Sequence, residues 1–327
     1  PTGIAGEAML RAETPQEQFN LINAGRRNLL INGNFRFSQR GNYSTATAVS
    51  STNYYLDRWK MDMSGVSATL QNNSNQDLPN GITVNTAKIT ATSSATGYLQ
   101  IQQKIEIEDY MDNREITISA WVKSNTNYPR LRVEGATTAL NNQDSTKQHS
   151  GSGEWEYLTM TLTTGNSLTN FIVGVIDWDG TTRAISSGDY FEVANVQCEI
   201  GSVATPFEHR SYGEELALCQ RYYTKIVSHS NYAVFGAGYN GTTTNAYFHI
   251  PLPVTMRALP TSAGLNGSFA IIDGSGYNVT SSSVDLSSSS PYALRADVVS
   301  SGLTHGRGVL LRANNDTDAF IYAHAEL

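Results

Sequence analysis

Apolar and polar residues alternate along much of the chain, and this alternation predicts β-strands. Apolar residues take every second position over 116–123 and again over 157–162. Because successive side chains of a strand point to opposite faces, each segment has one face turned toward a core. Similar strands are expected at 81–91, 97–106, 130–134, 170–177 and 189–201. Turn pairs such as Asn80-Gly81 and Asp179-Gly180 separate them, so the pattern predicts an antiparallel jelly-roll sandwich.

A second, smaller β-sandwich is expected after residue 210. Pro206 interrupts the preceding strand, and acidic residues followed by apolar ones over 211–225 predict a connecting helix. Further strands are expected at 232–239, 246–252, 268–272, 293–299, 309–312 and 319–327. The serine-rich stretch 281–290 is interpreted as a solvated loop.

The N-terminal residues 1–27 differ from the rest of the chain. Thr14, Pro15 and Glu17 suit the cap and first turn of a short helix. The apolar residues that follow are Phe19, Leu21 and Ile22. Since a helix of about ten residues is marginal alone in water, we expect this segment to attach to another protein of the assembly, with a frayed terminus as the alternative.

The chain is therefore expected to be all-β and to contain two folded units, consistent with its 327 residues. The expected divisions are an attachment segment over 1–27, a jelly roll over 28–210, a connecting helix over 211–225 and a β domain over 226–327.

Charge and composition narrow the choice of partners. The formal net charge is −7, and no run of basic residues exceeds the pair Arg26-Arg27, which argues against a nucleic-acid partner. No apolar stretch is long enough to insert into a membrane, and the first residues do not resemble a signal peptide. The two cysteines, Cys198 and Cys219, are expected to be buried thiols, which suits synthesis in a reducing cytoplasm.

Exposed aromatic residues among polar ones are the strongest candidates for binding, because a sugar ring stacks on an aromatic face while polar side chains bond its hydroxyls. Trp121 lies on the polar side of its predicted strand, and Trp155 and Tyr157 share a similar side. The alternative is that this side is a second buried face of the sandwich. The other candidates, in or near predicted turns, are Trp178, Tyr239, Tyr277 and Tyr292.

Motifs for catalysis or metal binding are not found in the sequence. The six histidines lack ligand spacing, and no nucleophile elbow or phosphate-binding loop is present. Asp177 and Asp179 could imitate a glycosidase pair, but the Gly180 that follows favours a turn. We therefore expect no cofactor, no metal and no enzymatic activity.

Several stretches resemble a family of phage virion proteins. Residues 28–35 (NLLINGNF), 38–41 (SQRG) and 55–59 (YLDRW) resemble the opening of a tail-fibre domain that is similar to jelly-roll carbohydrate-binding modules. Residues 196–208 (VQCEIGSVATPFE) resemble its closing strand, and 253–261 (PVTMRALPT) the C-terminal β domain of the same proteins.

The resemblance implies a trimeric, non-catalytic adhesin or decoration protein. The family's structural calcium is not expected here, because Arg36 and the pair Ala194-Asn195 occupy the positions of its acidic ligands. We therefore expect a short homotrimeric tail fibre in the virion, made in the host cytoplasm, that attaches to another virion protein and binds host polysaccharide or lipopolysaccharide. The alternatives are a capsid decoration or head-fibre protein and, in another class, a polysaccharide depolymerase.

Overall fold

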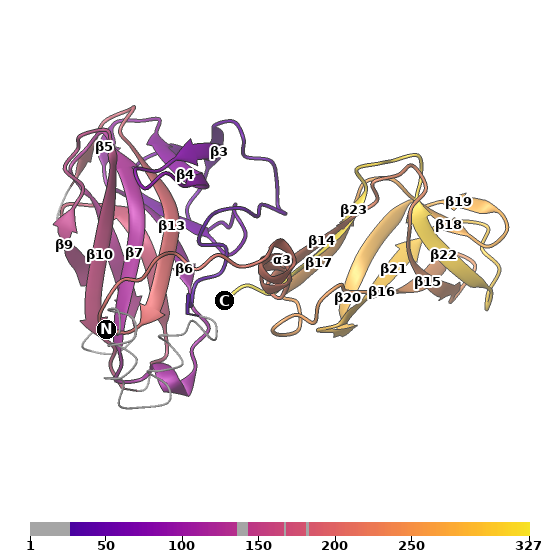
Figure 1. Ribbon diagram of the computed structural model, residues 1–327. Coiled ribbons are helices and arrows are strands. Elements are labelled where there is room, and N and C mark those ends of the chain that lie inside the picture. The colour runs from indigo at the N-terminus through magenta and orange to yellow at the C-terminus, as the bar shows by residue number, and fades with distance from the viewer. Residues whose placement is uncertain (1–26, 136–142, 167, 181–182) are drawn as a thin grey trace. The chain divides into compact units, whose positions relative to one another are not determined.

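The computed structural model describes residues 27–135, 143–166, 168–180 and 183–327. It divides into two compact units (Figure 1). Unit 1 contains the described residues up to Ser38 together with Asn42–Arg210, and unit 2 contains Gln39–Gly41 and Ser211–Leu327. The expected N-terminal helix, with Phe19, Leu21 and Ile22, lies outside the described residues.

Unit 1 is a sandwich of two antiparallel sheets. The first has the order β1 (Thr47–Val49), β3 (Ala68–Asp77), β4 (Thr83–Ala91), β13 (Tyr190–Ile200), β7 (Glu115–Ser124) and β10 (Trp155–Thr163). The second has the order β2 (Lys60–Ser64), β6 (Tyr98–Lys104), β11 (Phe171–Asp177), β8 (Pro129–Gly135) and β9 (Gln143–Gln148). Two short strands, β5 (Ala95–Thr96) and β12 (Ala184–Ile185), pair separately, and η1 (Asp109–Met111) is a 3-10 turn.

The strand order confirms the predicted all-β jelly roll. Within the two sheets, β4-β13-β7-β10 faces β6-β11-β8-β9. The chain crosses between the sheets from β6 to β7 to β8 and again from β9 to β10 to β11 to β13, whereas β3–β4 and β8–β9 pair within one sheet. The core between the sheets contains the apolar side chains of the alternating segments. These include Ile116, Ile118, Ala120 and Val122 of β7 and Phe171, Val173 and Val175 of β11.

A corner near the start of unit 1 is fixed by Asn32. Its backbone adopts the left-handed conformation, with φ 57°. The Asn32 side-chain amide donates hydrogen bonds to the carbonyls of Phe37 (2.9 Å) and Asp57 (3.0 Å), and its side-chain oxygen accepts one from the amide of Phe37 (2.9 Å). The indole of Trp59 donates to the Asn32 carbonyl (2.8 Å) and packs against the ring of Phe35, with centroids 4.9 Å apart. The corner is therefore closed by buried polar and aromatic groups.

Unit 2 is a second, smaller β-sandwich that begins with one helix, α3 (Tyr212–Gln220). Its larger sheet has the order β19 (Gly276–Asn278), β18 (Phe269–Ile272), β22 (Gly308–Ala313), β15 (Val234–Asn240), β16 (Asn245–Pro251), β21 (Ala293–Val299) and β20 (Ser281–Ser290). The smaller sheet has the order β14 (Tyr223–Val227), β23 (Phe320–His324) and β17 (Ser262–Asn266). Their apolar faces share one core, for example Phe248 and Leu294 with Ile321.

Two of the elements expected in unit 2 differ from the sequence prediction. The helix expected over 211–225 ends at Gln220, because Tyr223–Val227 has the aromatic and β-branched residues of a strand and pairs with β23. The expected loop 281–290 is the edge strand β20, which pairs with β21. An edge strand exposes most of its side chains, so serine is tolerated there and no apolar alternation reveals the strand.

Gln39–Gly41 belong to unit 2 although the residues on both sides of them belong to unit 1. The Gln39 side-chain amide donates to the carbonyl of Tyr223 (2.9 Å), and the guanidinium of Arg40 lies 3.8 Å from the centre of the Tyr223 ring. Arg40 also pairs with Glu326 (2.8 Å), whose side chain is 2% exposed. Unit 2 is therefore built from two separate parts of the sequence.

Candidate functional site

The predicted aromatic group Trp121, Trp155 and Tyr157 is assembled on the outer face of the six-stranded sheet. Trp121 on β7 lies opposite Tyr157 on β10, with ring centroids 5.1 Å apart and planes inclined by 47°. All three side chains are half-buried. The two tryptophans pack against a small apolar cluster of Leu78, Val84 and Ala194. Much of their surface is therefore used for packing, and the inclined rings do not form a flat platform.

A polar face covers the outer side of the five-stranded sheet. We define it by Asp62 on β2, by Tyr98, Gln100 and Gln102 on β6, and by Arg132 and Glu134 on β8. The strand register places Asp62 opposite Gln100, and Gln102 and Arg132 each opposite Gly174 on β11. Residues from four neighbouring strands thus meet on one surface, with their apolar neighbours turned into the core.

Hydrogen bonds hold the two central glutamines in position. The Gln100 side-chain amide donates both to the Gln102 side-chain oxygen (2.7 Å) and to the carboxylate of Glu134 (2.8 Å). Glu134 can reach Gln100 from β8 because the intervening Gly174 has no side chain. Both glutamines are buried, whereas Glu134 is half-buried. The glutamines therefore form the floor of the polar face.

Two aromatic residues border the polar face. Trp178, a predicted binding residue just after β11, is half-buried and meets Tyr98 edge to face, with centroids 5.8 Å apart. The Tyr98 hydroxyl donates to the carboxylate of Asp62 (3.3 Å). Partial burial, followed by the negative charge of Asp62, raises the pKa of Tyr98, so its hydroxyl remains protonated as a donor. An aromatic wall thus adjoins fixed donors and acceptors.

Arg132 on the polar face is oriented by an ion pair. The guanidinium of Arg132 bonds both carboxylate oxygens of Asp144 on β9, at 2.6 and 2.8 Å. Their side chains are 12% and 20% exposed. Since the bidentate pair neutralises the charge and fixes the guanidinium plane, Arg132 is prepared to bond neutral oxygen atoms more than to attract an anion.

The aspartates considered for catalysis occupy different environments. Asp177 is fully buried and accepts a hydrogen bond from Nε of Arg183 (2.7 Å). A second nitrogen of Arg183 donates to the carboxylate of Asp189 (2.8 Å). Burial raises the pKa of Asp177 against the opposing effect of Arg183. The Arg183 guanidinium also lies 3.9 Å from the centre of the Tyr128 ring. Asp177 therefore holds the Arg183 side chain and is closed to substrate, whereas Asp179 is half-exposed.

The three candidates in unit 2 do not lie together. Tyr239 on β15 is 55% exposed and meets Tyr247 on β16 edge to face, with centroids 5.6 Å apart. Tyr277 on β19 packs against the core. Tyr292 is 64% exposed, in the turn between β20 and β21. The sequence missed Tyr247, which the register places beside Tyr239.

Among the described residues, no group of three or more histidine, cysteine or acidic side chains could hold a metal ion. No helix in the described part of the chain is long and apolar enough to cross a membrane. Cys198 and Cys219 are free, buried thiols, as predicted.

Most of the polar face was not predicted, although the segment 98–104 (YLQIQQK) carries a signal. Glutamine alternates there with leucine and isoleucine, which places amides on one side of a strand. Only the position of β6 between β2 and β11 shows that these amides are buried and paired.

Comparison with known proteins gives structural similarity only: no protein family matches the chain, and no curated protein matches it in sequence. The enzymatically active domain of bacteriophage CBA120 tailspike protein 4 is 14% identical with a TM-score of 0.36, over 53% of this chain and 21% of that one. The carbohydrate-binding module TmCBM61, solved with β-1,4-galactotriose, is 11% identical with a TM-score of 0.32, over 54% and 100%. The tandem CBM22 modules of Paenibacillus barcinonensis Xyn10C are 10% identical with a TM-score of 0.32, over 88% and 98%. The chain thus spans about one fifth of the tailspike domain, and the β-sandwich assignment comes from the strands themselves.

Proposed function

We propose that this protein binds a glycan through the polar face of unit 1 and performs no chemistry on it. The observation that carries the proposal is the meeting of the Tyr98–Trp178 pair with a hydrogen-bonded floor of glutamines on one side of a sheet. A sugar ring offers an apolar C–H face and a rim of hydroxyl groups, and this surface has a partner for each.

Each group has a distinct part in the proposed complex. The exposed portion of the Trp178 ring packs against the sugar ring. Glu134 and Asp62 accept hydrogen bonds from sugar hydroxyls, and Arg132 donates to hydroxyl or ring oxygens. Because the glutamines and the Arg132–Asp144 pair are already ordered, little side-chain entropy is lost on binding.

The protein that carries this surface is proposed to be a short homotrimeric tail fibre of a phage virion. The NLLINGNF, YLDRW and PVTMRALPT stretches and their order along the chain support the proposal. In this role the N-terminal segment attaches to another virion protein, and the β units bind polysaccharide or lipopolysaccharide of the host surface. A capsid decoration or head-fibre protein would have the same chain and differ in its place on the particle.

Two variants test the binding proposal. One replaces a tryptophan beside the five-stranded sheet by alanine, and the other replaces a tyrosine on the six-stranded sheet by alanine. An immobilised panel of bacterial capsular polysaccharides and lipopolysaccharides is titrated with the wild-type protein, Trp178→Ala and Tyr157→Ala. Loss of one stacking ring costs about 1–2 kcal/mol, which is roughly a five- to thirtyfold weaker Kd. We expect that loss for Trp178→Ala and wild-type binding for Tyr157→Ala. The reverse result would move the site to the six-stranded sheet, and no binding to any member of the panel would end the proposal.

The proposed absence of catalysis is tested on the same panel. Prolonged incubation with the purified protein should release no new reducing ends. Release that stops in Asp179→Asn would establish the alternative, a depolymerase, because Asp179 is the half-exposed member of the predicted pair.

The proposed assembly is tested by mass and by location. Light scattering of the purified protein should give three times the chain mass of 35.6 kDa. A monomer at micromolar concentration would contradict the fibre. Labelled antibody bound to capsids and not to tails would favour the decoration protein.

A further inference from the structure

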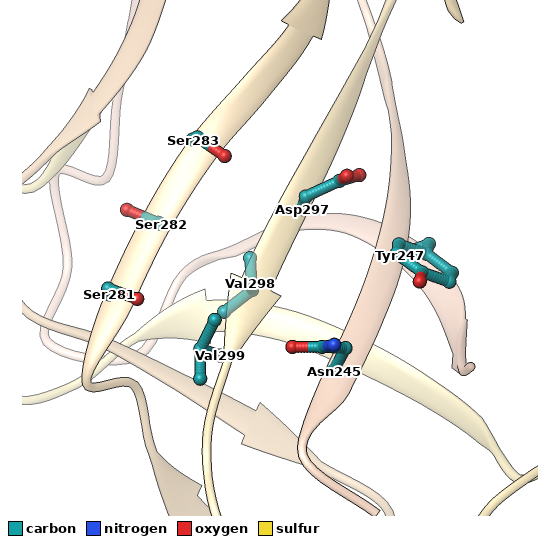
Figure 2. Close-up of a pocket in the computed structure, with 8 residues that line it drawn as sticks. All are labelled: Asn245, Tyr247, Ser281, Ser282, Ser283, Asp297, Val298 and Val299. Atoms are coloured by element: carbon teal, nitrogen blue, oxygen red, sulfur yellow. The ribbon is translucent and has the colours of Figure 1, made fainter. Parts of the chain in front are cut away.

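A hollow of about 240 Å³ lies on the outer face of the larger sheet of unit 2 (Figure 2). It is smaller than the roughly 300–1,000 Å³ of sites for drug-sized ligands, so it suits one small ring. The side chains around it belong to Asn245, Tyr247, Val299, Asp297, Ser281 and Ser283. This surface is separate from the polar face, and none of its residues was predicted from the sequence.

Strand register explains why the surface is hollow. Across β16, β21 and β20, one row contains Asn245, Val299 and Ser281, and the next contains Tyr247, Asp297 and Ser283. Figure 2 shows these two rows side by side. The serines on the edge strand are short, whereas Tyr247 on β16 is large, so the surface descends from the tyrosine ring toward β20. The side chain of Val299 adds an apolar floor.

A third row keeps the acidic group and the ring in place. It contains His249, Arg295 and Asp285. The guanidinium of Arg295 lies 4.4 Å from the centre of the Tyr247 ring and donates to Asp297 at 2.9 Å. Arg295 therefore covers one side of the Tyr247 ring, while Tyr239 meets the ring edge to face and Gly241 lies against it. The ring is held in this position where it lines the hollow.

The hollow offers hydrogen-bonding groups that the protein does not use itself. Within the described residues, the hydroxyls of Ser281 and Ser283 and the side-chain amide of Asn245 have no hydrogen-bond partner. Asp297 keeps further lone pairs besides those that face Arg295. The donors and acceptors are mixed, and the one carboxylate is already paired with a cation. This chemistry fits a neutral ligand with several hydroxyl groups better than a phosphate or a metal ion.

We propose that this hollow is a second saccharide site, which takes one neutral sugar ring of a glycan. The ring packs against Tyr247 and Val299, and its hydroxyls bond Asp297, Asn245 and the serines of β20. The inference rests on the proposed function for the class of ligand, but it places binding on a different unit and a different set of residues. One chain would then hold a glycan at two independent points, which strengthens attachment to a repeating polymer without any new contact.

The test separates the two sites within the full chain. Saturation-transfer NMR is recorded with the methyl glycosides of glucose, galactose and N-acetylglucosamine, on the wild-type protein and on Trp178→Ala/Arg132→Ala, which disables the polar face. We expect at least one glycoside to bind the double variant. Adding Ser283→Tyr, which fills the hollow with a residue that suits a strand, should weaken this Kd at least about tenfold.

Two further variants control for folding and shape. Asp297→Asn keeps the shape of the hollow and removes its charged acceptor, so it should weaken the same Kd roughly tenfold. Ala237→Tyr adds a tyrosine to an exposed position of the same face outside the hollow and should leave the Kd unchanged. Binding that survives both Ser283→Tyr and Asp297→Asn would overturn the inference.

The remaining outcomes distinguish this inference from the proposed function. Glycoside binding that is present in the wild type and lost in Trp178→Ala/Arg132→Ala would support the polar face and reject the second site. The absence of glycoside binding in both proteins would reject the second site, whereas the proposed function would fall only if the polysaccharide panel also showed no binding.

Discussion

Asn32 provides a quantitative test of how the fold of unit 1 is fixed. Asn32→Ala removes the hydrogen bonds to the amide and carbonyl of Phe37 and to the carbonyl of Asp57. Phe37 is 5% exposed and Asp57 is fully buried, so water cannot replace the lost partners. The Phe37 carbonyl keeps the hydrogen bond donated by the Asp57 amide (3.1 Å), so the main losses are at the Phe37 amide and the Asp57 carbonyl. Each buried hydrogen bond lost in this way costs about 1–3 kcal/mol. With φ at 57°, alanine adds about 1 kcal/mol of backbone strain. We expect a total loss of about 4 kcal/mol in the free energy of unfolding, because neighbouring terms do not add fully.

Two variants separate the hydrogen bonds from the strain. Asn32→Gly loses the same bonds without the strain, so it should be about 1 kcal/mol more stable than Asn32→Ala. Asn75 has a similar φ of 56° and is exposed, and among the described residues its side chain makes no hydrogen bond. Asn75→Ala should therefore cost only about 1 kcal/mol.

The assay is guanidinium unfolding followed by tryptophan fluorescence. All four tryptophans of the chain lie in unit 1, so the signal reports that unit alone. The midpoint should fall while the slope of the free energy against denaturant stays constant. A loss below about 1 kcal/mol for Asn32→Ala would refute the assignment of the corner to Asn32.

Three further predictions concern other parts of the chain. Burial raises the pKa of the Cys198 thiol, and Cys219 is also buried, so neither should react with a thiol reagent until the protein is denatured, when both should react. Hydrogen bonds from the serines that follow Asp285 lower its pKa to about 2. Because the pKa of Asp285 is lower in the folded than in the unfolded protein, this carboxylate stabilises unit 2 above about pH 4. Its contribution should disappear as the pH falls toward 2, and a carboxyl NMR titration would follow the change. A Cβ atom at Gly174 would lie 2.5 Å from the carbonyl oxygen of Ile101. Gly174→Val should therefore destabilise unit 1 by roughly 1–3 kcal/mol in the same unfolding assay. Unchanged stability would contradict the close approach of β11 and β6.

The sequence predicted the strands whose two sides differ in polarity. The β7 segment is the clearest example. Its apolar side chains lie in the core, and side chains on its other face, such as Trp121, contact those of the neighbouring strand β10 on a half-buried surface. Periodicity failed for β3 (Ala68–Asp77) and β20, where amide and hydroxyl residues dominate. Those strands are specified by pairing with their neighbours, which a local pattern does not contain.

The candidate sites could be predicted only in part for a related reason. Trp178 and Tyr239 were found because aromatic residues near turns are conspicuous in any sequence. Their partners Tyr98 and Tyr247 come from other strands, and only the register brings them together. A glutamine such as Gln100 is expected to be exposed, yet it is buried and donates to Glu134, which reaches it across Gly174.

The short segment Gln39–Gly41 affects how this chain can change during evolution. A gene fragment that encodes only residues 211–327 lacks the guanidinium that lies 2.8 Å from the buried carboxylate of Glu326. Recombination that replaces unit 2 as one continuous block would therefore exchange an incomplete module. We expect the two units to be inherited together, and sequence variation to arise by substitutions on their outer faces.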